Sequence, residues 1–215
     1  MNNLDEEIKK YLPQYLSEIE LNNLRKELEN FPTDGTKDTV YTIALANADY
    51  LLQGDGVANL DYINFPDVVI KPIDVILLSN TCDMSIENKR MNPCRIMYAP
   101  ILKFDIYARK LRESFPSQRV DNHLRDIKAQ QISQAMFLPK GGKMDYDGIV
   151  FFDRAISIPL SEETMQSMCD NKLFTLSNFG LYLLLLKLSI HFTRIQERID
   201  RTTGEVLGQM ENKSH

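Results

Sequence analysis

The run IDVILL at residues 73–78 constrains the fold of this chain more than any other feature of its sequence. A strand with one face in water alternates apolar and polar side chains, but after Asp74 this run has no polar member. A strand of this kind is buried on both faces or is central in a small barrel. The fold therefore has to cover residues 75–78 on both sides.

Shorter strand-like runs flank this strand, separated by Asn, Asp, Pro and Gly residues that favour turns. They cover residues 56–65, 94–104 and 148–160. Apolar residues at helical spacing predict helices at residues 4–11, 17–30, 121–135 and 177–201, and a further helix after Ser161. Ser161 and Ser177 stand where helix N-caps belong. The mixture predicts an α+β protein.

The pattern divides the 215 residues into four parts. We expect a helical segment at residues 1–39, a strand-rich core with an inserted helix at residues 40–160, helices at residues 161–201 and a tail at residues 202–215. This length suits one core domain with helical additions.

Charge is distributed unevenly along a chain whose formal net charge is −5. Residues 1–40 hold five basic and nine acidic side chains, whereas residues 89–143 hold twelve basic and four acidic ones. A basic middle inside an acidic protein is compatible with an anionic ligand. It is equally compatible with the acidic N-terminal helices docking on the basic middle.

The last predicted helix carries a row of basic side chains on one line of its surface. The row consists of Lys187, His191, Arg194, Arg198 and Arg201. Two interpretations stay open: a solvated face that pairs with nearby acids, or a ridge that contacts phosphates.

Cys82 and Asp83 follow the apolar strand directly, and three roles fit them. A nucleophilic Cys82 needs a base, and the chain has only His123, His191 and His215. A metal site would combine Cys82 with Cys94, Asp83 and a histidine, but the cysteine spacing is not typical of one. The third role is structural: a buried thiol closing the strand, with Asp83 capping the turn or pairing with Arg90 or Arg95.

Several features favour a cytoplasmic protein. The polar start MNNLDEEIKK is no secretory signal, and the most apolar run, residues 180–186, is too short to span a bilayer. Three cysteines without paired spacing indicate reduced thiols. We expect no membrane association, no cofactor and no metal.

Four stretches of the core resemble the PemK/MazF-like toxins. They are GDGVANLDY at residues 54–62, KPIDVILLSN at residues 71–80, RIMYAPI at residues 95–101 and DGIVFFDRAISIPLSEE at residues 147–163. The resemblance implies a small SH3-like β-barrel at residues 40–160. Members of this family are mostly sequence-preferring ribonucleases that need no metal, and they dimerise.

Two family positions differ here. Lys71 stands where the family has an arginine before proline, and Leu102 stands where it has threonine or serine. Arginine grips a phosphate through two parallel hydrogen bonds, which lysine cannot do, and leucine cannot orient a phosphate oxygen. The resemblance therefore implies a degenerate ribonuclease, and any surviving catalysis would depend on Lys71, Asp83 and Arg95.

The sequence is also similar to a group of uncharacterised bacterial proteins. The shared features are QGDG at residues 53–56, SNTCD at residues 79–83, FLP at residues 137–139 and KLSIHFTR at residues 187–194. Ser79 and Cys82 are taken as structural members of this motif. The similarity implies a fold and a bacterial or mobile-element setting, not a reaction.

The leading hypothesis is a barrel that binds RNA or another anionic ligand. Its candidate binding residues are Lys89, Arg90, Lys187, His191 and Arg194. The alternative is a non-catalytic protein-interaction or regulatory module, with a protein partner or a dimer. A hydrolase that depends on Cys82 is a third class.

Overall fold

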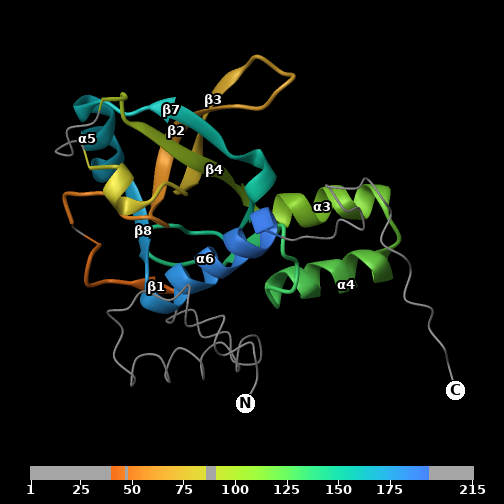
Figure 1. Ribbon diagram of the computed structural model, residues 1–215. Coiled ribbons are helices and arrows are strands. Elements are labelled where there is room, and N and C mark those ends of the chain that lie inside the picture. The colour runs from red at the N-terminus through yellow and green to blue at the C-terminus, as the bar shows by residue number, and fades with distance from the viewer. Residues whose placement is uncertain (1–39, 47, 86–90, 194–215) are drawn as a thin grey trace, which may run out of the picture.

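The computed structural model describes residues 40–46, 48–85 and 91–193, and within them the chain has a mixed α+β fold (Figure 1). An antiparallel sheet of eight strands is covered by helices, so the predicted α+β class is confirmed. Of the helices described, none has both the length and the apolar character that crossing a membrane requires.

The strands lie across the sheet in the order β1-β8-β2-β3-β4-β6-β5, and β7 also pairs with β4. Their bounds are β1 Tyr41–Thr42, β2 Gly56–Ile63, β3 Ile70–Leu77, β4 Arg95–Lys103, β5 Ala135–Leu138, β6 Gly148–Phe151, β7 Ile156–Pro159 and β8 Lys172–Leu176. The described helices are α3 Phe104–Ser114, α4 Ser117–Lys128, α5 Glu162–Asp170 and α6 Asn178–Thr193, with short 3₁₀ turns η1 Thr81–Asp83 and η2 Phe152–Arg154. β4 is central, because it pairs with β3 on one side and with both β7 and β6 on the other.

The apolar run of the sequence forms the end of β3 and is buried on both faces, as predicted. Val75, Ile76 and Leu77 have no exposed surface. Ile76 packs in a core with residues of α6, whereas Val75 and Leu77 pack in a second core with Met168 of α5. Because successive side chains enter different cores, the strand has no polar face.

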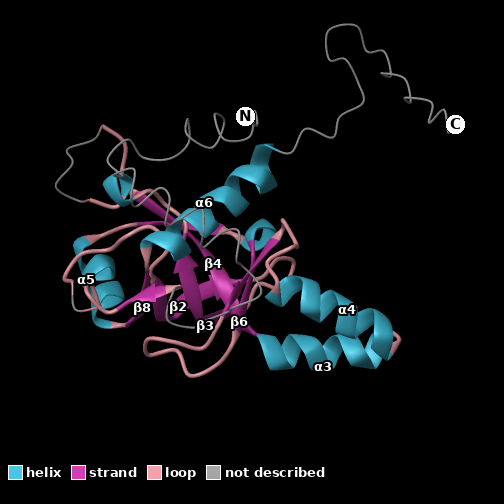
Figure 2. Ribbon diagram, turned by 90° about the horizontal axis from the view of Figure 1, so that it is seen from below, coloured by secondary structure: helices cyan, strands magenta, loops and turns pink. Residues whose placement is uncertain are grey.

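α3 and α4 project from the sheet as an antiparallel pair (Figure 2) and pack on β5 and β6 through a third core. The sequence predicted one helix here, at residues 121–135, and this prediction is wrong at both ends. α4 begins at Ser117, and the chain leaves it through Gln130, which has a φ of 56°. The apolar residues beyond belong to β5, whose alternate side chains face two cores.

The interval 161–201, expected to hold only helices, also contains β8, which pairs with β1 and β2. The two predicted N-caps are confirmed. Ser161 Oγ accepts a hydrogen bond from the Thr164 amide, and Ser177 Oγ accepts one from the Gly180 amide, each at 3.1 Å. The helices predicted at residues 4–11 and 17–30, and the tail, lie outside the described residues.

The sheet is open, and the closed barrel implied by the resemblance does not form through strand pairing in the described residues. Hydrogen bonds nevertheless join the two ends of the sheet. The Lys143 amide donates to the Leu173 carbonyl at 2.7 Å, and the Tyr41 hydroxyl donates to the Pro139 carbonyl at 2.7 Å. The loop after β5 is thus held against β8 and β1 without adding a strand pair.

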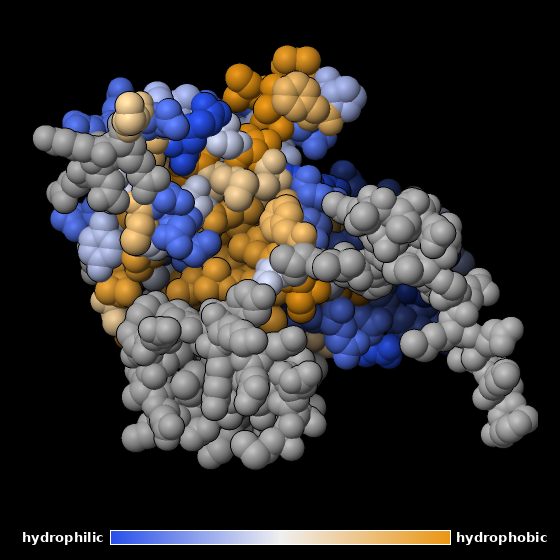
Figure 3. All heavy atoms as spheres, viewed as in Figure 1, coloured by the Kyte–Doolittle hydropathy of each residue, from blue (hydrophilic) through white to orange (hydrophobic). Residues whose placement is uncertain are grey.

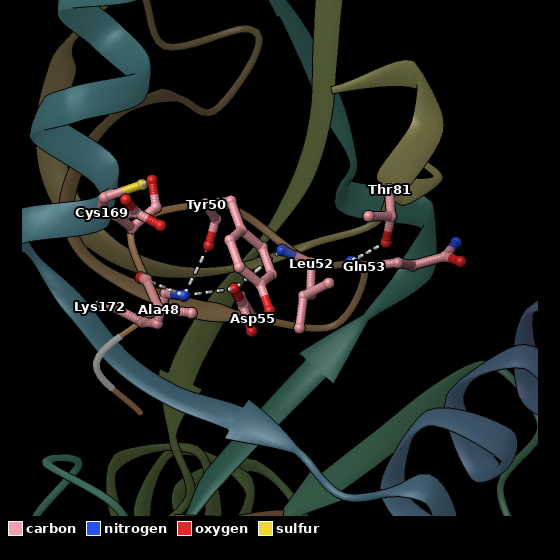
Figure 4. A network of polar contacts seen from close by, with 9 residues as sticks. Ala48, Tyr50, Leu52, Gln53, Asp55, Thr81, Cys169 and Lys172 are labelled. Atoms are coloured by element: carbon pink, nitrogen blue, oxygen red, sulfur yellow. Dashed lines mark hydrogen bonds and ion pairs between the residues drawn. The ribbon is translucent and has the colours of Figure 1, made fainter. Parts of the chain in front are cut away.

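A buried ion pair links the segment before β2 to β8 (Figure 4). Asp55 and Lys172 are 0% and 2% exposed, and Lys172 Nζ lies 3.1 Å from Asp55 Oδ2. The same ammonium donates to the carbonyls of Ala48 and Tyr50, and the Leu52 amide donates to Asp55. Burial raises the pKa of Asp55, while the Leu52 amide and the Lys172 charge oppose the rise.

The segments QGDG, at residues 53–56, and SNTCD, at residues 79–83, meet in space beside this pair. The Gln53 amide donates to Thr81 Oγ1 at 3.0 Å, and its side-chain nitrogen donates to the Leu78 carbonyl at 2.8 Å. Gly54 has a φ of 88°, which favours glycine, and a Cβ at Gly56 would meet the Phe174 ring at 2.3 Å. The two motifs therefore form one structural junction between the start of β2 and the end of β3.

Removing one member of the buried pair should destabilise the fold strongly. Lys172→Met leaves the Asp55 carboxylate buried without its counter-charge, and we expect a loss of about 3–5 kcal/mol in the free energy of unfolding, measured by urea denaturation. Asp55→Asn should act in the same direction.

The matched control is the exposed pair of Arg112 and Asp121, whose side chains are 53% and 61% exposed. Arg112→Gln should cost less than about 1 kcal/mol, because water already solvates both charges. Equal effects of Arg112→Gln and Lys172→Met would contradict the central role of the buried pair.

Candidate functional site

Ser79, Asp83 and Arg95 line one pocket of about 300 Å³ at the end of β3. Arg95 Nε donates to Ser157 Oγ at 3.2 Å, and its Nη2 donates to the Ser157 carbonyl at 2.6 Å. Ser79 Oγ accepts a hydrogen bond from the Met97 amide at 2.8 Å. The Arg95 guanidinium is thus bound to Ser157 of β7. The predicted pairing of Asp83 with Arg95 stays a prediction. The pocket therefore brings together three predicted residues, and the guanidinium of Arg95 in it is held by neutral groups.

Cys82 does not have the buried position expected of a structural thiol: its side chain is exposed. The η1 turn places it outward, with the Cys82 amide donating to Asn80 Oδ1, and Met84 fills the core instead. His123 hydrogen-bonds Tyr107, and His191 contacts the rings of Phe152 and Phe192. These contacts give no support to a nucleophilic Cys82.

Lys187 is buried, which corrects its predicted role in binding. Its Nζ donates to the carbonyls of Gln130, Ile132 and Ala135 at 2.7–2.9 Å. Lys187 therefore holds the connection between α4 and β5, and it cannot join a basic ridge on the surface of α6. Burial lowers the pKa of Lys187 to about 8.

Of the remaining predicted binding residues, the structure describes only His191. His191 lies half-buried on α6, and Lys89, Arg90 and Arg194 lie outside the described residues. Lys71 is exposed on β3, opposite Tyr62. Eight residues separate it from Ser79 along the chain, or about 26 Å at ~3.3 Å per residue of strand. Because Arg95 lines the same pocket as Ser79, Lys71 and Arg95 are not brought together.

A larger cavity, of about 660 Å³, lies between the sheet and α3. We call it the α3 groove. Its lining comprises the bases Lys103, Lys110 and Arg154, the aromatic residues Tyr107, Phe115 and Tyr146, and apolar side chains that include Ile73, Ile101, Leu102, Ile106 and Leu111. Among the described residues, Asp74 is its only acidic lining residue. The groove combines positive charge with aromatic surface.

The groove exists because two neighbouring strands separate. β3 pairs with β4 only through Val75, Ile76 and Leu77, so its first half continues without β4 beside it. The last residues of β4, 101–103, pair with β6 instead and lead directly into α3. The first turns of α3 therefore face the free part of β3 across the groove.

The carboxylate that lines the groove is already occupied. Tyr146 donates to Asp74 Oδ2 at 2.5 Å, and the Asn59 amide donates to its Oδ1. Burial and the bond to Asp74 raise the pKa of Tyr146. Within the described residues, no ion pair joins a carboxylate to Lys103, Lys110 or Arg154. The three cations are therefore available to a ligand.

Aromatic rings hold two of these cations. Lys103 Nζ lies 4.9 Å from the centre of the Tyr146 ring, and the Arg154 guanidinium lies 4.9 Å from that of Phe151. Cation–π contacts orient the charges without neutralising them.

None of the predicted site residues that the structure describes lines the α3 groove. Lys103 and Lys110 belong to the basic interval 89–143, which was the available signal. Arg154 and Tyr146 lie outside that interval and reach the groove only through folding. Leu102 lines the groove as well.

A scan against models of protein families finds no match to the chain, and a search of curated proteins finds none. The function of the groove is therefore inferred from its own chemistry.

The buried amine of Lys187 should give the fold a distinctive dependence on pH. In the folded protein the pKa of Lys187 is about 8, below the ordinary value of 10.5. Between these two pH values the unfolded chain therefore binds more protons at Lys187 than the folded chain does. Raising the pH from about 7.5 to about 9.5 should therefore increase the free energy of unfolding of the wild type, relative to Lys187→Met, by about 2 kcal/mol.

The comparison with Lys187→Met cancels the titration of other groups. Urea denaturation of both proteins at the two pH values measures the difference. If both proteins show the same dependence on pH, Lys187 does not titrate between these pKa values.

Proposed function

We propose that this protein binds single-stranded RNA in the α3 groove and is a divergent relative of the PemK/MazF-like barrels. The observation that carries the proposal is a set of three cations, Lys103, Lys110 and Arg154, which have no carboxylate partner among the described residues and share one groove with two tyrosines. Phosphates are attracted by such charges, and unstacked bases pack on aromatic rings.

The composition of the groove favours a nucleic-acid strand over a small inorganic anion. A volume of about 660 Å³ is larger than one phosphate needs, and the apolar residues Ile73, Leu102 and Ile106 have no role in holding a simple ion. Single-stranded binding sites combine a basic track with stacking surfaces, which is the combination here. Flexible single strands also suit a narrow cavity better than a duplex does.

The relationship to the toxin family rests on the sequence resemblance. The open sheet is compatible with a barrel that is not closed by strand pairing between β1 and β5, since hydrogen bonds of the loop after β5 join those two ends. Pro72 lies in one of the resembling stretches, Leu102 directly follows another, and both line the groove. Leu102 removes the hydroxyl that the family uses at this position. RNA cleavage by the family's own residues is therefore not part of the proposal.

A second candidate function is self-association through the tip of the β2–β3 hairpin, with a second copy of this chain as the partner. Phe65, Val68, Val69 and Ile70 are each more than half exposed, and Figure 3 shows hydrophobic atoms on the protruding hairpin. Next to them, residues 70–74 of β3 pair only with β2 among the described residues. Two such free edges pair symmetrically in an antiparallel dimer.

Binding to a fluorescent single-stranded RNA of about 12 nucleotides tests the first proposal. Fluorescence anisotropy between about 50 and 200 mM salt should show affinity falling with salt. The variant Lys103→Gln/Lys110→Gln/Arg154→Gln should bind more weakly, and its salt slope should be smaller by about 0.7 for each phosphate that the variant no longer neutralises.

A control of equal charge change is Arg109→Gln/Arg112→Gln/Arg125→Gln, which removes exposed arginines of α3 and α4 outside the groove. It should keep most of the affinity. No binding at low salt, or an equal loss in both triple variants, would reject the α3 groove as an RNA site.

Analytical ultracentrifugation over a wide range of concentration tests the second candidate. The wild type should dimerise as concentration rises, and Val68→Asp should remain monomeric because it places a charge in the apolar contact. Ile43→Asp is the matched control, since Ile43 is 94% exposed and lies outside the hairpin. A wild type that stays monomeric throughout would exclude this interface.

A further inference from the structure

We propose that the protein reads one base of the bound strand and prefers guanine, which enters a pocket beside the α3 groove. We call this cavity, where the chain turns from α3 into α4, the α4 pocket. Its lining comprises Leu111, Phe115, Arg119, Val120 and His123. The inference rests on the proposed RNA binding and adds a base specificity to it.

The α4 pocket adjoins the groove along one wall. Leu111 and Phe115 line both cavities. The oxygen of Tyr107, a residue of the groove, lies 2.9 Å from Nε2 of His123, a residue of the pocket. A strand that follows the groove therefore passes the pocket, and one of its bases can turn in beside Leu111 and Phe115.

The groove offers a contact for the RNA backbone at this point. Lys110 and Ser114 line the groove four residues apart on α3, which places them on the same side of the helix. They directly precede Leu111 and Phe115 in the chain. A phosphate held by Lys110 and Ser114 therefore lies next to the wall that the groove shares with the pocket.

The size of the α4 pocket suits a single base. Its volume is about 220 Å³, below the roughly 300–1,000 Å³ of pockets that enclose a drug-sized ligand. Leu111, Phe115 and Val120 give it apolar walls, which pack against the faces of a flat ring.

Arg119 stands beside the aromatic ring on which a base would stack. Its guanidinium carbon lies 5.6 Å from the centre of the Phe115 ring. Carbon atoms in direct contact lie about 3.5–4.0 Å apart, so the guanidinium does not lie flat over the ring centre. Phe115 is also 47% exposed. A base that packs on the open part of the ring therefore presents its edge to the N–H donors of Arg119.

The donors of Arg119 are not held by an acid. Within the described residues no carboxylate forms an ion pair with Arg119, and Asp121, two residues further along α4, pairs with Arg112 at 3.0 Å. No acidic residue of the described chain lines the α4 pocket. The pocket therefore presents donors to a base but no carboxylate that would accept from an amino group.

Guanine fits this arrangement better than the other bases. A guanidinium carries donors only, and guanine offers two adjacent acceptors, O6 and N7. Adenine has an amino group in place of O6, so a donor would face a donor. Cytosine has adjacent acceptors in N3 and O2, but its single ring covers less of Phe115 than a purine does, and the same holds for uracil.

The experiment measures the affinity of the full chain for labelled RNAs by fluorescence anisotropy. An all-uridine RNA of about 12 nucleotides is compared with the same RNA carrying one central guanosine, adenosine, cytidine or 7-deazaguanosine. Guanosine should raise the affinity about tenfold, as expected for one bidentate arginine contact. Adenosine, cytidine and 7-deazaguanosine, which lacks N7, should each raise it less than about threefold.

The variant Arg119→Ala tests the residue. The ratio of the affinities for the guanosine RNA and the all-uridine RNA should fall from about ten to less than about two. This ratio cancels the general loss of positive charge. The matched control is Arg109→Ala, which removes an exposed arginine of α3 outside both cavities and should keep the wild-type ratio.

Each outcome assigns failure to one proposal. If the wild type binds none of the RNAs, the proposed function fails. If it binds all of them equally, or prefers another base, RNA binding stands and the guanine pocket is overturned. A preference for guanosine that persists in Arg119→Ala, or that Arg109→Ala loses to the same extent, also overturns the pocket.

Discussion

The rest of the structure depends on the ion pair of Asp55 and Lys172, which lies almost entirely out of water. A charge buried in this way has to be compensated within the protein. Here the compensation joins the loop before β2 to the first residue of β8, a strand more than a hundred residues later in the chain. The QGDG and SNTCD motifs are fastened beside it, so β2, β3 and β8 are aligned at one end of the sheet.

That alignment places β3 between two cores. β4 continues beyond the three residues through which it pairs with β3. β4 bonds to β6 and leads into α3, which leaves the first half of β3 facing a helix across open space. The α3 groove is therefore a consequence of how the central strands separate. Within the described part of the chain its three cations form no ion pair with a carboxylate, and Asp74, the acid that lines the groove, accepts hydrogen bonds from Tyr146 and Asn59.

The α3 groove thus gathers three cations and three aromatic residues in one cavity. Leu102 of β4 and Tyr107 of α3 line this same cavity. The exposed hairpin tip is a second, apolar surface that adjoins the groove, because Pro72, Ile73 and Asp74 of the same strand line the groove.

The sequence by itself determined the α+β class, the doubly buried strand and the caps at Ser161 and Ser177, because these depend on local pattern and on burial alone. It did not determine which charges face water. Lys187 looks like a surface base, yet three carbonyls from the connection between α4 and β5 surround it, and Cys82 looks like a core thiol, yet the η1 turn exposes it. Only the tertiary structure decided the groove, because β3, β4, α3 and η2 each contribute a wall, and their meeting depends on contacts between distant parts of the chain.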